Sequence, residues 1–105
     1  MAEHFHIDDI ASFSTEKMTV KITHDSINFR QLLFCFMAGQ ELPVHSHDVD
    51  SEIIFAIMDG EGILIEEGKE VEVKKGDIVI GQVRIPHGIR AVSDLKVLVT
   101  ITPPL

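Results

Sequence analysis

The chain has 105 residues, a length typical of a single domain, and carries a formal net charge of −8 at pH 7. Its largest cluster of basic residues is the pair Lys74-Lys75, which argues against binding to nucleic acid or to an acidic membrane surface. The single cysteine, Cys35, excludes an intramolecular disulfide framework.

Residues 1–17 carry mixed charge and only short apolar stretches, and we expect them to form an N-terminal arm or an edge strand. They lack the positive and apolar regions of a signal peptide. The longest apolar run, residues 32–39, is far too short to span a bilayer. We therefore expect a cytoplasmic protein. His4 and His6 form a His-x-His pair without a surrounding framework, and we expect both to be solvated.

From Met18 the hydrophobic pattern has a period of two, because Met18, Val20 and Ile22 alternate with polar residues. This alternation predicts a half-buried strand. Residues 27–38 predict a second, longer strand that is apolar on both faces from Leu32 onwards.

A barrel has only one interior, so one face of this second strand needs a cover. We assign Leu32, Phe34 and Phe36 to that face. The N-terminal arm could cover it, but its apolar residues are few. We therefore expect a homodimer that packs two such faces together.

Further short strands follow, separated by turns every eight to twelve residues or so. Residues 53–58 predict a buried strand, and Asp59-Gly60 is typical of a β-hairpin turn. The last strand places four apolar side chains on one face: Leu95, Val97, Val99 and Ile101. Because no long segment keeps the helical period, the chain predicts an all-β fold, either a sandwich or a small closed barrel.

Two histidines follow the second strand, and a carboxylate stands close behind them. His45 and His47 are two residues apart, so on an extended strand their imidazoles project from the same face. Glu52 follows five residues later, across a segment of turn-forming residues that can reset the direction of the chain. Two imidazoles and a carboxylate are typical of a metal-ligand set.

A fourth ligand is available in His87, forty residues after His47. Here the chain resembles the cupin family, whose first motif requires the spacing of Gly39, His45, His47 and Glu52, and whose second motif requires that of Gly76 and His87. Seven residues, and not the family's six, separate Glu52 from Gly60. In the second motif Gln82, Arg84 and Ala91 replace the family's Pro, Gly and Asn.

The resemblance covers roughly residues 27–102 and implies a double-sheet jelly roll and paired barrels. We place the boundaries of this single barrel domain at residues 18–105. The resemblance also implies one divalent transition metal ion per chain (iron, manganese, nickel, zinc or copper), held by His45, His47, Glu52 and His87. A β-bulge could absorb the additional residue before Gly60. If Glu52 instead turns away, the site consists of three histidines.

The functional hypothesis is a metal-dependent enzyme of the dioxygenase, decarboxylase or isomerase class. An open coordination position would bind a small, anionic organic molecule. The alternative is a non-catalytic module that binds or senses a small ligand and carries a structural metal. The residues assign no catalytic group beyond the metal ligands.

Overall fold

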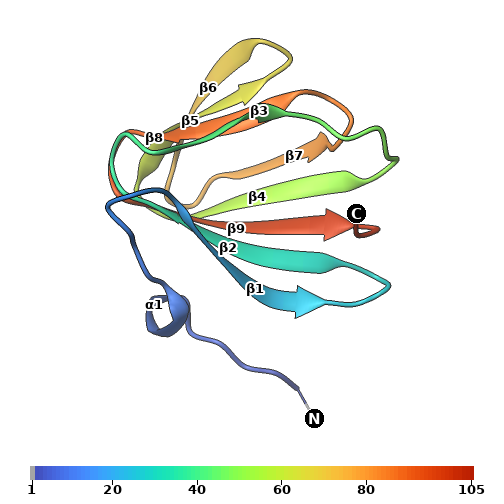
Figure 1. Ribbon diagram of the computed structural model, residues 1–105, viewed down its shortest axis with the longest axis horizontal. Helices are drawn as coiled ribbons and strands as arrows, with labels where there is room; N and C mark the ends of the chain where they lie inside the picture. The colour runs from blue at the N-terminus through green and yellow to red at the C-terminus, as the bar shows by residue number, and fades with distance from the viewer. Residues whose placement is uncertain (1) are drawn as a thin grey trace.

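The computed structural model describes residues 2–105, which form two antiparallel sheets facing each other (Figure 1). The five-stranded sheet has the order β1-β2-β9-β4-β7, and the four-stranded sheet has the order β3-β8-β5-β6. The elements are α1 (Ile7–Ile10), β1 (Thr19–Asp25), β2 (Arg30–Phe36), β3 (Glu41–His45), β4 (Glu52–Asp59), β5 (Glu61–Glu66), β6 (Lys69–Lys74), β7 (Ile78–Gln82), β8 (His87–Ala91) and β9 (Leu95–Thr102). This arrangement confirms the predicted all-β jelly roll.

The core lies between the two sheets and consists of alternate residues from their strands. In β9 the predicted alternation is confirmed, because Leu95, Val97, Val99 and Ile101 are buried while the residues between them are partly exposed. β4 follows the same rule and directs Ile53, Phe55 and Ile57 inward. Alternation of this kind is what a strand with one buried face requires.

The assignment of faces in β2 was wrong. Phe34 and Phe36 are part of the central core cluster, and Leu32 packs against it. The opposite face of β2 carries Leu33 and Cys35, which are only 0% and 1% exposed. Both faces of the strand are therefore already covered within one chain, and Leu32, Phe34 and Phe36 do not form a dimer surface. The homodimer itself stays a prediction.

The N-terminal segment lies outside the five-stranded sheet, on the side away from the four-stranded sheet (Figure 1). Its Asp8 forms an ion pair of 2.8 Å with Lys96 of β9, and the ring of Phe13 lies 6.0 Å from the same ammonium group. The side chain of Gln40 donates a hydrogen bond to the carbonyl oxygen of Ser14 at 2.6 Å. These contacts bring the segment to the outer side of β9 and to the loop after β2. The arm thus lies beside the outer face of the five-stranded sheet near Lys96, whose backbone pairs with Cys35 of β2.

Asp59-Gly60 does not form a β-hairpin, because β4 and β5 belong to different sheets and do not pair with each other. The turn instead carries the chain from the five-stranded sheet to the four-stranded sheet. Gly60 has φ +86°, and a methyl group built on it would overlap the carbonyl oxygen of Asp94. Only glycine satisfies both the left-handed backbone and this close approach.

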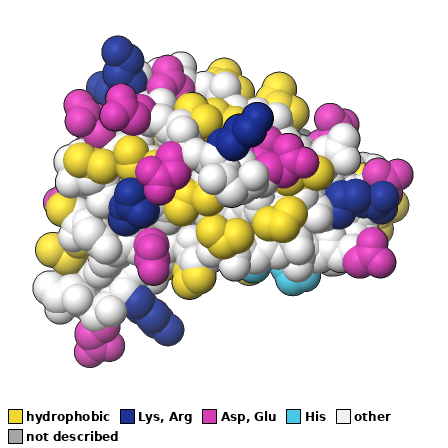
Figure 2. All heavy atoms as spheres, turned by 90° about the horizontal axis from the view of Figure 1, so that it is seen from above, with side chains coloured by type: hydrophobic (Ala, Val, Ile, Leu, Met, Phe, Trp, Pro, Cys, Tyr) yellow, Lys and Arg dark blue, Asp and Glu magenta, His cyan; other side chains and the backbone are white. Residues whose placement is uncertain are grey.

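The outer side of the four-stranded sheet carries hydrophobic, acidic and basic side chains that are interspersed (Figure 2). On this side the Lys and Arg side chains are separated by acidic and hydrophobic ones, so they do not gather into a basic patch. Among residues 2–105, the structure has no helix with the length and apolar character needed to cross a membrane.

Candidate metal centre

Two of the three predicted histidines are paired across neighbouring strands of the four-stranded sheet. His45 is the last residue of β3 and His87 is the first residue of β8, and the two are direct partners in the antiparallel register. Their ring centroids lie 4.7 Å apart. His87 is 3% exposed, and its ring lies 6.0 Å from that of Phe55 on the facing sheet. Residues far apart in the sequence thus meet because β3 and β8 are neighbours.

His47 lies in the loop after β3, with its ring centroid 5.5 Å from that of His45. Its backbone N–H donates to the carbonyl oxygen of Val83 at 3.3 Å, and the N–H of Val83 donates to the carbonyl oxygen of Ser51 at 2.9 Å. These bonds connect the β3–β4 loop to the β7–β8 loop, at the right-hand end of the barrel in Figure 1. The side chain of His47 is exposed, so the group of histidines opens to solvent.

The hydrogen bonds of His45 and His87 leave one ring nitrogen of each able to bind a metal. Nδ1 of His45 lies 2.9 Å from the carbonyl oxygen of Pro43, and Nδ1 of His87 lies 2.8 Å from that of Ile85. A carbonyl oxygen can only accept, so each Nδ1 carries the proton, and Nε2 of the neutral ring keeps its lone pair. Fixing one ring nitrogen in this way is typical of metal-binding histidines. The donor set fits a divalent transition metal.

Burial lowers the pKa of His87 below its ordinary value of 6.5, and the nearby rings of His45 and His47 lower it further. The carbonyl of Ile85 and the carboxylate of Glu66 act in the opposite direction. The neutral form, which a metal requires, is therefore favoured at His87. Within residues 2–105, however, no three His, Cys, Asp or Glu side chains are already placed to hold one ion. Metal binding would require side-chain rotation, for which the exposed ring of His47 has room.

Glu52 does not join the histidines in this arrangement. It is exposed at the start of β4, and its neighbour Ile53, 5% exposed, points into the barrel together with Phe55. Successive residues of a strand face opposite sides, so Glu52 lies on the outer face of the sheet. The bulge that could have absorbed the additional residue does occur, but it lies between Ile57 and Asp59, too far along β4 to turn Glu52 inward.

The structure instead brings a different carboxylate to the inner side of the barrel. Glu66, the last residue of β5, is the direct cross-strand partner of His87. The inward position of Glu66 was not predicted from the sequence, because Glu66-Glu67 resembles the start of a turn. Its spacing could have indicated the inward direction, because Glu66 stands two residues beyond Leu64, an inward-facing residue of the same strand.

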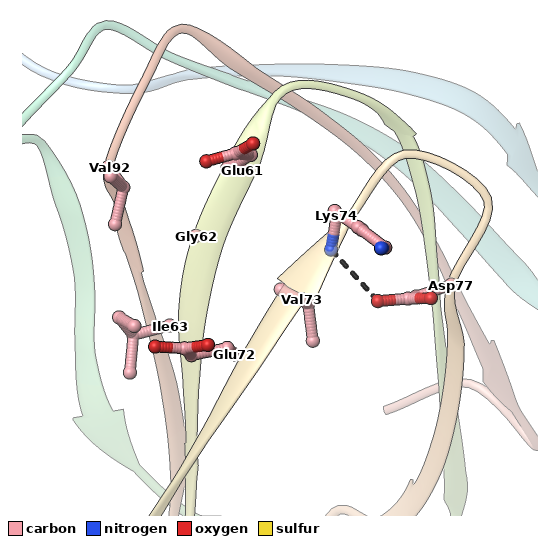
Figure 3. Close-up of a pocket in the computed structure, with 8 residues that line it drawn as sticks. All are labelled: Glu61, Gly62, Ile63, Glu72, Val73, Lys74, Asp77 and Val92. Atoms are coloured by element: carbon pink, nitrogen blue, oxygen red, sulfur yellow. Dashed lines mark hydrogen bonds between the residues drawn. The ribbon is translucent and has the colours of Figure 1, made fainter.

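A hollow in the surface lies at the other end of β5, around Glu61 and Gly62, and has a volume of about 380 Å³ (Figure 3). Its lining includes three carboxylates, one ammonium group and no histidine. The backbone N–H of Lys74 donates to Oδ2 of Asp77 at 2.9 Å across one side of it. Because it lies at the opposite end of β5 from Glu66 and His87, this hollow is not the space into which the three imidazoles open.

Residues 32–101, two thirds of the chain, match the model of the cupin domain family. The chain belongs to the cupin family. The matched segment begins within β2 and ends within β9, so it includes all three histidines and strands of both sheets.

Solved structures with this fold cover the whole chain. An RmlC-like cupin protein from Desulfovibrio desulfuricans is 38% identical with a TM-score of 0.93, and the match covers 100% of this chain and 99% of that one. The protein TT1209 from Thermus thermophilus is 24% identical with a TM-score of 0.90, and the match covers 99% and 100% of the two chains. The second of these supports the fold alone.

A curated relative, the uncharacterized protein MJ1618 from Methanocaldococcus jannaschii, is 34% identical over 68 residues. That match covers 63% of this chain and 54% of the relative, so the chain spans about half the length of the curated protein it matches.

Proposed function

We propose that this cupin binds one divalent transition metal ion through His45, His47 and His87, and that it is an enzyme acting on a small, anionic organic molecule. The observation that carries this proposal is the hydrogen bonding of His45 and His87. Each ring donates its Nδ1 proton to a backbone carbonyl two residues earlier, which leaves Nε2 of both rings as a donor to a metal.

The exposure of His47 supports chemistry on an external molecule over a purely structural metal. A structural site is normally closed by protein ligands, whereas a catalytic site keeps an open position. Here His87 is buried but His47 is exposed, so an ion bound between them would be reached from solvent. A small molecule could enter from that side.

The side chains of the chain itself would orient the ion and restrict water on its inner side. Nδ1 of His87 is hydrogen-bonded to the carbonyl oxygen of Ile85, and its ring packs near the ring of Phe55. Phe55 and Ile53 form an apolar wall on the facing sheet, so a ligand would meet water only at the outer side. When bound, the ion would act as a Lewis acid and as a template for an anionic oxygen ligand, in a reaction of the dioxygenase, decarboxylase or isomerase class.

Metal content and affinity test the first half of the proposal. We expect one equivalent of iron, manganese, nickel, zinc or copper per chain after reconstitution, and loss of binding in the His45→Ala/His87→Ala double variant. The matched control is the double variant His4→Ala/His6→Ala, which removes another His-x-His pair whose residues are exposed. Equal binding by wild type and by the His45→Ala/His87→Ala variant would contradict the proposal.

Turnover tests the second half. The reconstituted protein should consume oxygen, release carbon dioxide or isomerise a substrate when it is screened against small diketones, enediols and carboxylic acids, and the His87→Ala variant should not. Binding of such molecules to every metal form without any turnover would favour the non-catalytic sensing or carrier module.

A further inference from the structure

Glu66 points toward the space between the two sheets, on the same side as His87. In β5 the inward residues are the even-numbered ones, since Leu64 is buried in the core cluster. In β8 the first residue, His87, is buried, and it pairs directly with Glu66. Direct partners in an antiparallel pair project from the same face of the sheet, so the carboxylate and the imidazole share one side.

The carboxylate of Glu66 extends across the barrel as far as the five-stranded sheet. A methyl group built on Gly81 of β7 would overlap Oε2 of Glu66 and would lie 3.6 Å from its Cδ. The same methyl group would lie 3.9 Å from Cγ2 of Ile53, the residue that pairs with Gly81. Gly81 therefore leaves the room that the carboxylate occupies. Glu66 and Ile53 reach the same place from opposite sheets.

Within residues 2–105, no lysine or arginine forms an ion pair with this carboxylate. The ion pairs of the described chain involve other acidic groups, namely Glu3, Asp8, Asp25, Asp59 and Glu70. A partly buried carboxylate without a counter-ion loses solvation and gains no compensating charge. A divalent ion beside the histidines would supply that charge, and carboxylate oxygen is a common partner of imidazole in such sites.

The turn after β5 is also connected to the histidine region. The backbone N–H of Glu67 donates to the carbonyl oxygen of Pro86, the residue before His87, at 3.1 Å. This bond holds the end of β5 beside the start of β8, so the backbones that carry Glu66 and His87 keep a fixed separation. Glu66 can therefore reach an ion beside His87 by movement of its side chain, without movement of the backbone.

We infer that Glu66, and not Glu52, is the carboxylate that completes the metal site of this chain. The inference rests on the proposed function, because it presupposes an ion at the three histidines. It assigns a ligand from β5, in the same sheet as His45 and His87, and it leaves Glu52 as an exposed residue of the outer face.

Titration with Co²⁺ and Zn²⁺, followed by calorimetry and by the visible spectrum of Co²⁺, tests this assignment without any enzyme assay. Glu66→Gln should weaken affinity by about tenfold or more, since even the loss of an outer partner costs roughly 10–100-fold. Its matched control, Glu52→Gln, should bind as wild type does. Wild-type affinity and an unchanged Co²⁺ spectrum in Glu66→Gln would overturn the inference.

Two further variants separate a ligand role from a structural one. Gly81→Ala should displace the Glu66 carboxylate and weaken metal binding without lowering the free energy of unfolding, because alanine suits a strand better than glycine does. Ile53→Glu added to Glu66→Gln should restore tight binding, since it delivers a carboxylate to the same place from β4. Wild-type affinity in Gly81→Ala would contradict the inference.

The results also distinguish the two proposals. If wild-type protein binds neither Co²⁺ nor any of the five metals expected above, the proposed function fails. If wild type binds and Glu66→Gln binds equally well, only the assignment of Glu66 fails.

Discussion

The two sheets of the barrel contribute differently to its histidine end. The four-stranded sheet supplies the polar groups, with His45 and His87 on neighbouring strands and Glu66 beside them. The five-stranded sheet faces them with Ile53 and Phe55, which belong to the apolar core. One sheet thus carries the candidate metal ligands, while the other forms an apolar wall that faces them. Changes in the buried apolar residues of the wall should mainly affect stability, and changes in the polar groups of the four-stranded sheet should mainly affect binding.

The largest expected effect is a loss of stability when a core side chain of the five-stranded sheet is removed. Phe36→Ala removes a ring that is 0% exposed, so it should lower the free energy of unfolding by about 3–5 kcal/mol. Urea unfolding monitored by circular dichroism measures this loss. Ile80→Ala, at a position of the same sheet that is 63% exposed, is the control and should change stability by at most about 0.5 kcal/mol. Equal effects of the two variants would contradict the division between inner and outer faces.

A smaller effect is expected at the corner between the sheets. Gly60→Ala should destabilise the fold more than Gly68→Ala does, although both glycines have positive φ angles. The Gly68 variant meets only the backbone penalty of about 1–2 kcal/mol, because nothing lies within 4 Å of its new methyl group. Overlap with Asp94 should add about 1–3 kcal/mol at Gly60. Thermal or urea unfolding of both variants checks the difference.

On the polar sheet, stability should depend on pH through His87. Burial lowers its pKa in the folded chain below the ordinary value of 6.5, so the unfolded chain binds more protons in the range between the two values. The stabilising contribution is complete above pH 6.5 and is lost as the pH falls through the folded-state pKa. Unfolding of metal-free protein at about pH 7.5 and about pH 5 should show this loss, and a His87→Leu variant should show less of it. If the stability of wild type and of His87→Leu depends on pH in the same way, His87 is not the source of the pH dependence.

The oligomeric state is the least direct test of the difference between the two sheets, and we expect it to have the smallest effect on either of them. Because Leu32, Phe34 and Phe36 lie inside, a dimer must use another surface, and its formation should not alter the wall. We still expect a mass of about twice 11.7 kDa by light scattering at micromolar concentration. A mass equal to one chain would show that the N-terminal arm is sufficient cover for β2 and β9.

The sequence predicted that His45 and His47 lie close together and that β9 alternates, because both depend on local spacing. His45 and His47 are two residues apart, and Leu95 to Ile101 alternate over one strand. In β9 the period of a strand converts this spacing directly into side-chain direction, whereas His47 lies in the loop just after β3. The match of His87 came from its separation from Gly76, a relation along the chain and not in space.

Only the tertiary structure decided which carboxylate faces the histidines and which face of β2 is central. Glu52 differs from the inward position of Ile53 by a single residue, and a shift of one residue reverses the direction of a side chain. β2 is apolar on both faces, so its pattern could not distinguish the core from the surface under the N-terminal segment. Glu66 reaches its place because β5 pairs with β8 and because Gly81, on the other sheet, has no side chain. These relations join residues from three strands, and no spacing within one segment contains them.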